Sequence, residues 1–129
     1  MTSEWTPSSA DGDASNVALL QLTSYRRAEA VVIQAAGEVD VSTVDQLMEA
    51  VTVALATKPE RVVLDLGAVR FVASCGLREL LRGHAAAVSD GIRFIVAATD
   101  GALRRSLEVT GLDHELETFD SVDAALAAN

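Results

Sequence analysis

The stretch that most constrains the fold is residues 61–88, R-V-V-L-D-L-G-A-V-R-F-V-A-S-C-G-L-R-E-L-L-R-G-H-A-A-A-V. It begins with a continuous apolar run, typical of a strand covered on both faces: Val62, Val63 and Leu64. Four apolar residues and one histidine then recur at the spacing of one helical face, which predicts an amphipathic helix: Leu77, Leu80, Leu81, His84 and Val88. A buried strand followed by a short loop and an amphipathic helix predicts an α/β fold.

Before this stretch, residues 17–22 and 30–36 read as two strands joined by a polar turn at residues 24–27. The spacing S-x-x-D at Ser42 and Asp45 predicts a capping box in its acidic form. A helix follows it, with one apolar face formed by Val44, Leu47, Met48, Val51 and Leu55.

After it, residues 92–97 form another short apolar strand, and Asp100 can cap a helix that carries Leu103, Leu107 and Val109. A brief strand at residues 116–119 and a last helix from Ser121 complete the chain; its inward residues are Val122, Ala125 and Leu126. The predicted order is therefore β-β-α-β-α-β-α-β-α. We expect one α/β domain, a mixed β-sheet with helices packed mainly on one side, because a hairpin is followed by parallel crossovers.

Length, net charge and cysteine content limit the number of domains, the class of partner and the location in the cell. A length of 129 residues suits one domain, and polar residues with Pro7 and Gly12 predict a flexible tail at residues 1–16. The net charge of −9 predicts repulsion from phosphate backbones and anionic membranes, so we expect neither as a partner. A single cysteine, Cys75, and no signal segment at the N-terminus predict a cytoplasmic protein.

No enzymatic motif stands out. His84 and His114 are not spaced with Cys75 as metal ligands, and A-S-C-G around Ser74 lacks the G-x-S-x-G arrangement of a nucleophile elbow. No G-K-S/T phosphate-binding loop is present. We therefore expect a protein that binds another protein, with no catalysis, metal or cofactor of its own.

Residues 65–77, D-L-G-A-V-R-F-V-A-S-C-G-L, resemble the signature of the STAS domain family, specifically the bacterial anti-sigma factor antagonists. That signature reads D-x-S-x-V-x-F-hydrophobic-D-S-(S/T)-G-L, and the matching residues are Asp65, Val69, Phe71, Ser74, Gly76 and Leu77. G-E-V-D at residues 37–40 and the stretch at residues 103–112 also resemble the family. The resemblance covers about residues 20–126 and implies a STAS domain at residues 17–129, with a small mixed sheet and helices.

The resemblance implies a function. In the family, the unphosphorylated domain binds an anti-sigma factor, a serine kinase, and so frees a sigma factor. The kinase then phosphorylates the serine that corresponds to Ser74, and a phosphatase restores binding. ATP and magnesium would belong to the kinase. The resemblance implies partner-binding residues at Glu38, Asp40, Ser74, Cys75 and Gly76.

Three departures from the signature leave alternatives open. Ala73 replaces an aspartate, Cys75 replaces a serine or threonine, and Gly67 replaces a serine. Ser74 could simply cap its helix, Cys75 could be a redox-sensitive thiol or a small buried one, and Glu38 and Asp40 could form a solvated acidic turn. The alternative functions are a constitutive STAS adaptor, in a stress-signalling assembly or a lipid-transport complex, and a small-molecule or nucleotide sensor that uses a pocket near the Ser74 loop.

Overall fold

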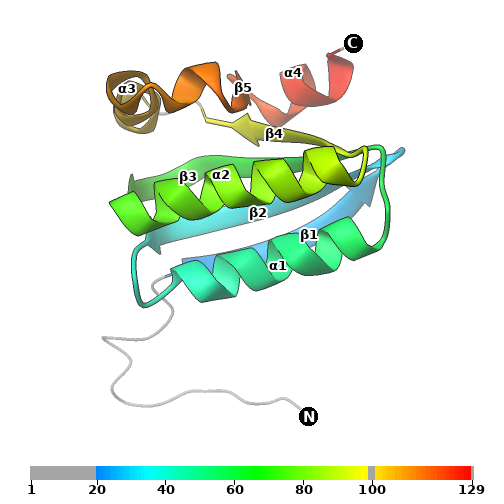
Figure 1. Ribbon diagram of the computed structural model, residues 1–129, viewed down its shortest axis with the longest axis horizontal. Coiled ribbons are helices and arrows are strands. Elements are labelled where there is room, and N and C mark those ends of the chain that lie inside the picture. The colour runs from blue at the N-terminus through cyan, green and yellow to red at the C-terminus, as the bar shows by residue number, and fades with distance from the viewer. Residues whose placement is uncertain (1–19, 99–100, 129) are drawn as a thin grey trace.

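The computed structural model describes residues 20–98 and 101–128 (Figure 1). In chain order its elements are β1 (Leu20–Arg27), β2 (Ala30–Val39), α1 (Val44–Ala56), β3 (Arg61–Val72), α2 (Ser74–Ser89), β4 (Arg93–Ala97), α3 (Gly101–Thr110), the 3₁₀ helix η4 (Leu112–His114), β5 (Glu117–Phe119) and α4 (Val122–Ala127). The predicted order of strands and α-helices is confirmed. The predicted tail, residues 1–16, and the predicted cap Asp100 lie outside the described residues.

The five strands form one sheet in the order β1-β2-β3-β4-β5. β1 pairs antiparallel with β2, and every later neighbour is parallel. Parallel neighbours require crossover connections, and α1 and α2 lie side by side across one face of the sheet (Figure 1). The predicted mixed sheet with an opening hairpin is confirmed.

The core has two unequal layers, and the alternation along β2 shows why. Val31 and Ile33 point into the larger layer, between the sheet and the helices α1, α2 and α3. Val32 points to the opposite face, where it joins Val63 in a smaller cluster under Ala125 of α4. Successive strand residues face opposite sides, so a strand buried on both faces reads as continuously apolar. The expectation of helices mainly on one side is confirmed, with α4 covering the other face.

Two strands are longer than the sequence predicted. The polar turn expected at residues 24–27 is wrong, because β1 continues to Arg27 and the chain reverses at Ala28, where φ is 54°. β1 is an edge strand, where polar side chains can face water while the backbone still pairs with β2. β3 likewise extends to Val72 and so absorbs most of the predicted loop. Its register against β2 shifts twice, between Gln34 and Ala36 and between Gly37 and Glu38.

The buried face of α2 is rotated from the predicted one. Leu77 and Leu80 are buried as expected, but Val88 is 59% exposed, so its predicted place in the core is wrong. The buried face instead continues through Gly83 and Ala87. These small residues let α2 approach its neighbours closely, whereas periodicity alone favours the larger valine.

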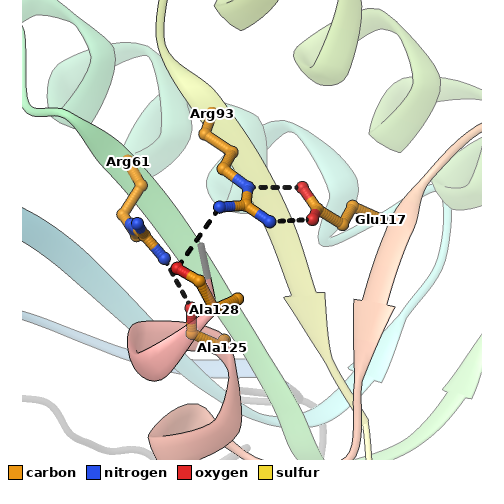
Figure 2. A network of polar contacts seen from close by, with 5 residues as sticks. All are labelled: Arg61, Arg93, Glu117, Ala125 and Ala128. Atoms are coloured by element: carbon orange, nitrogen blue, oxygen red, sulfur yellow. Dashed lines mark hydrogen bonds and ion pairs between the residues drawn. The ribbon is translucent and has the colours of Figure 1, made fainter.

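A polar network attaches the C-terminal elements to the sheet (Figure 2). Arg93 Nε donates to Glu117 Oε1 at 2.8 Å, and Arg93 Nη2 donates to Glu117 Oε2. Arg61 Nη1 donates to the carbonyl oxygen of Ala125 at 2.7 Å, and Arg93 Nη1 to that of Ala128 at 3.4 Å. Two arginines therefore hold both β5 and α4.

This network predicts a pH-dependent contribution to stability. The hydrogen bonds from Arg93 lower the pKa of Glu117, so the pair stabilises the fold above the unfolded-state pKa, and the contribution is lost as pH falls through the folded-state pKa. Because the Glu117 side chain is 35% exposed, we expect Glu117→Gln to lower the free energy of unfolding by only about 1 kcal/mol at pH 7. At pH 3 we expect a smaller loss.

Urea denaturation at both pH values measures this effect. The control is Asp90→Asn, which removes an exposed pair with Lys58 at 3.5 Å and should cost less than about 0.5 kcal/mol. Equal losses for Glu117→Gln at pH 7 and pH 3 would contradict the prediction.

Candidate functional site

Ser74 is the first residue of α2 and is exposed. The N-cap is Ala73, which has extended backbone angles, and no side chain caps this end of the helix. The prediction that Ser74 caps the helix is therefore wrong, because its hydroxyl lies one position too late to accept from the second or third helical N–H. The hydroxyl is left accessible on the surface.

The connection between β3 and α2 is a single residue held against β2. Ala73 N donates to the carbonyl oxygen of Val39 at 2.8 Å, and Leu77 N donates to the carbonyl oxygen of Ala73 at 3.0 Å. A Cβ on Gly76 would lie 2.8 Å from a methyl carbon of Val39 and equally close to one of Val72. The start of α2, and with it Ser74, is therefore set by close packing against the ends of β2 and β3.

Cys75 and Gly76 face inward. Gly76 is buried, and Cys75 is half-buried against the main core cluster. Of the two roles considered for Cys75, its packing favours the small apolar side chain. These two residues fix the position of Ser74.

Glu38 and Asp40 lie at the end of β2, beside the segment that leads to Ser74. Glu38 pairs in register with Phe71, and Val39 with Val72. The Glu38 carboxylate lies 3.6 Å from the exposed guanidinium of Arg70. The structure thus brings Glu38, Asp40 and Ser74 together at the carboxyl ends of β2 and β3.

The turn after β2 is built around Asp40 and Thr43. Asp40 Oδ1 accepts from Ser42 N at 2.9 Å and from Ser42 Oγ at 2.7 Å, and these bonds lower the pKa of the Asp40 carboxyl. The buried Thr43 hydroxyl accepts from Asp40 N and donates to the carbonyl oxygen of Glu38, both at 2.9 Å. The predicted capping box is wrong: α1 has no side-chain cap, and Ser42 bonds Asp40 instead of serving Asp45.

A groove of about 590 Å³ runs from Ser74 to α3. Its apolar walls include Phe71, which is 54% exposed, and Val109, which is 79% exposed. Val109 lies two residues past the buried Leu107, and so about 200° around the helix, which places its side chain outside the core. Exposed apolar side chains gathered in a groove with polar residues at its rim are a feature of protein-interaction and ligand-binding sites.

The α3 side of this groove, which includes Arg105 and Val109, was not expected from the sequence. One signal could have found it. Leu103 and Leu107 define the inward face of α3, so an apolar residue at position 109 is out of phase with that face.

The part of the chain that the structure describes contains neither a cluster of metal ligands nor a helix that could span a membrane. Across residues 20–98 and 101–128, no three His, Cys, Asp or Glu side chains are grouped so as to hold a metal ion. None of the described helices is long and apolar enough to cross a membrane.

The N-cap position leads to a prediction about Ala73. Aspartate and asparagine are among the best N-cap residues and alanine among the worst, so Ala73→Asp and Ala73→Asn should each raise the free energy of unfolding by about 1 kcal/mol. Urea denaturation measures both, and the asparagine variant separates the hydrogen bond from the charge. A loss of stability in both variants would show that a side chain at this position cannot cap α2.

The fold is thus a small α/β domain, a mixed sheet with three helices on one face, and it carries an exposed serine at a groove with apolar walls. The model of the STAS domain family matches residues 21–125. The chain belongs to the STAS domain family, as the motif around Ser74 predicted.

Relatives and solved structures agree with this assignment. The chain is 33% identical over 95 residues to the anti-sigma-F factor antagonist RsfB of Mycobacterium tuberculosis, an alignment that covers 74% of this chain and 77% of RsfB. A crystal structure of an anti-sigma factor antagonist from Mycobacterium paratuberculosis superposes with a TM-score of 0.77 at 30% identity, covering 83% of this chain and 91% of the other. The anti-sigma factor antagonist SpoIIAA in its unphosphorylated form shares the fold, with a TM-score of 0.66 at 20% identity over 82% and 92% of the two chains.

Proposed function

We propose that this protein is an anti-sigma factor antagonist. It binds an anti-sigma factor through the surface that carries Glu38, Asp40 and Ser74, and it is released when Ser74 is phosphorylated. The observation that carries the proposal is the exposed Ser74, which caps no helix and lies at a groove with exposed Phe71 and Val109. The relatives named above as anti-sigma factor antagonists support the partner class.

The proposed chemistry is a phosphoryl transfer by the partner. The anti-sigma kinase would supply ATP and magnesium and transfer the γ-phosphoryl group to Ser74 Oγ. An O–P bond forms to the serine, the bond to ADP breaks, and the hydroxyl proton is released. The modified side chain carries a charge of about −1.5 to −2 at pH 7.

Such a charge is unfavourable at the groove beside Ser74 when a partner covers it. A complex that covers Phe71 and Val109 would have to remove water from the phosphate on Ser74, and an unpaired buried charge is costly. Glu38 and Asp40 lie on the same surface and would add like charge. Phosphorylation therefore favours release, and a phosphatase would restore binding.

The proposed binding residues act in two ways. Glu38, Asp40 and Ser74 contact the partner directly, with the Asp40 carboxylate held by Ser42 in a defined orientation. Cys75 and Gly76 contribute by setting the start of α2 through their packing.

Phosphorylation by the cognate anti-sigma kinase and ATP, located by peptide mass spectrometry, tests the proposal. We expect one phosphate, on Ser74. A matched pair sharpens the result, because Ser106 is a second exposed serine in the same groove. Ser106→Ala should be modified as the parent is, and Ser74→Ala should not. Phosphate on another residue, or none where an established antagonist is modified, would refute the assignment.

A further inference from the structure

Two adjacent arginines on α3 have different surroundings. Arg104 lies 3.0 Å from the Asp120 carboxylate and donates to the carbonyl oxygen of Ala98 at 3.3 Å. Arg105 is exposed and lines the same groove as Ser74. Among the described residues its guanidinium makes no ion pair. Arg104 therefore supports the fold, and Arg105 presents its charge to the groove.

Among the described residues that line the groove, Arg105 has the one charged side chain. The chain has a net charge of −9, yet the lining of the groove contains no Asp or Glu. The other side chains of the α3 wall include the hydroxyl of Ser106, one residue further along. A guanidinium with neighbouring hydroxyl groups suits a phosphate, which arginine binds through two parallel N–H···O bonds.

We propose that Arg105 binds the phosphate on Ser74 within the same molecule. The ion pair spans the groove from α2 to α3 and covers the apolar walls formed by Phe71 and Val109. Phosphorylation then closes the docking groove as well as adding charge to it. This inference rests on the proposed phosphorylation of Ser74 and identifies the residue that responds to it.

Two other arginines could compete for the phosphate. Arg78 is exposed and lies four residues after Ser74 on α2, a spacing at which helical side chains can interact. Arg70 lies 3.6 Å from Glu38 and is already paired. Arg78 does not line the groove, so a phosphate bound by Arg78 would leave the groove open.

A titration of the phosphate tests the proposal without any partner. The second pKa of phosphoserine is about 6, and a nearby guanidinium lowers it. Phosphoserine can be installed at position 74 of the full chain by genetic code expansion, and ³¹P NMR then reports its pKa. We expect that of the parent to lie about 0.5 unit below that of Arg105→Gln. Arg78→Gln should titrate as the parent does.

The charge control is Arg82→Gln. Arg82 is exposed on α2 and lies eight residues past Ser74, about 12 Å along the helix, so its removal should leave the phosphate pKa unchanged. An Arg105→Gln titration equal to that of the parent overturns the inference, and so does a shift produced by Arg78→Gln instead. Because the phosphoserine is installed without the kinase, failure of the kinase to modify Ser74 would refute the proposed function separately.

Discussion

Gly76→Ala is expected to lower the free energy of unfolding by about 1–2 kcal/mol, although alanine is the better helix former. The added Cβ would lie 2.8 Å from methyl carbons of both Val39 and Val72, closer than carbon atoms approach in folded proteins. Relief requires a shift of β2, β3 or the start of α2, and crowding of this kind costs about 1–3 kcal/mol. The helix propensity gain of about 1 kcal/mol offsets only part of that cost.

The same substitution elsewhere on α2 provides the control. A Cβ on Gly83 would lie 3.3 Å from Met48 Cε, the mobile end of a flexible side chain, so Gly83→Ala should be neutral or slightly stabilising. Val72→Ala combined with Gly76→Ala should recover part of the loss, because it removes one of the two close contacts. Urea denaturation of all variants decides the point, and a Gly76→Ala protein as stable as the parent would contradict it.

The sheet could be predicted from the sequence because its signal is local. Val32 and Val63 lie in short continuous apolar runs, which are typical of strands covered on both faces. The hairpin followed by alternating helices then left few possible topologies. The ends of elements were predicted less well, since β1 extends through polar residues wherever its backbone can pair with β2.

The face of a helix is harder to predict when glycine and alanine form the contact. Helical spacing placed Val88 in the core, but Ala87 occupies that place and the valine is exposed. A small residue allows closer approach, and its own hydrophobicity does not reveal that role. The same limit explains Gly76, whose importance depends on atoms of β2 and β3 rather than on its neighbours in the sequence.

The candidate site could be predicted only in part. The motif led to Ser74, Glu38 and Asp40, which the fold brings together at the carboxyl ends of β2 and β3. The capping assignment failed because it depends on a single residue step: the helix begins at Ser74, which makes Ala73 the cap. The contribution of α3 to the groove was not foreseen, because Phe71 and Arg105 are 34 positions apart and meet only through the packing of α3 beside β3.

A neutral substitution isolates the role of the hydroxyl. Ser74→Ala should change the free energy of unfolding by less than about 0.5 kcal/mol, because the serine makes no capping bond. It should also bind the anti-sigma factor with the affinity of the parent, because the unmodified serine contributes little charge or volume. A large loss of affinity would contradict this and show that the hydroxyl makes a strong hydrogen bond in the complex.

Ser74→Glu is expected to weaken binding of the anti-sigma factor at least about tenfold, or about 1.4 kcal/mol, while the domain stays folded. In the first turn of α2 a carboxylate interacts favourably with the helix dipole, by about 0.3–1 kcal/mol. The midpoint temperature of thermal unfolding should therefore be unchanged or slightly raised. At the rim of the groove, the same carboxylate must lose water when the partner covers Phe71 and Val109. Isothermal titration calorimetry with the parent and both variants measures the affinities. If the folded Ser74→Glu protein binds as tightly as the parent, charge at this position does not control docking, and a constitutive STAS adaptor becomes the better description.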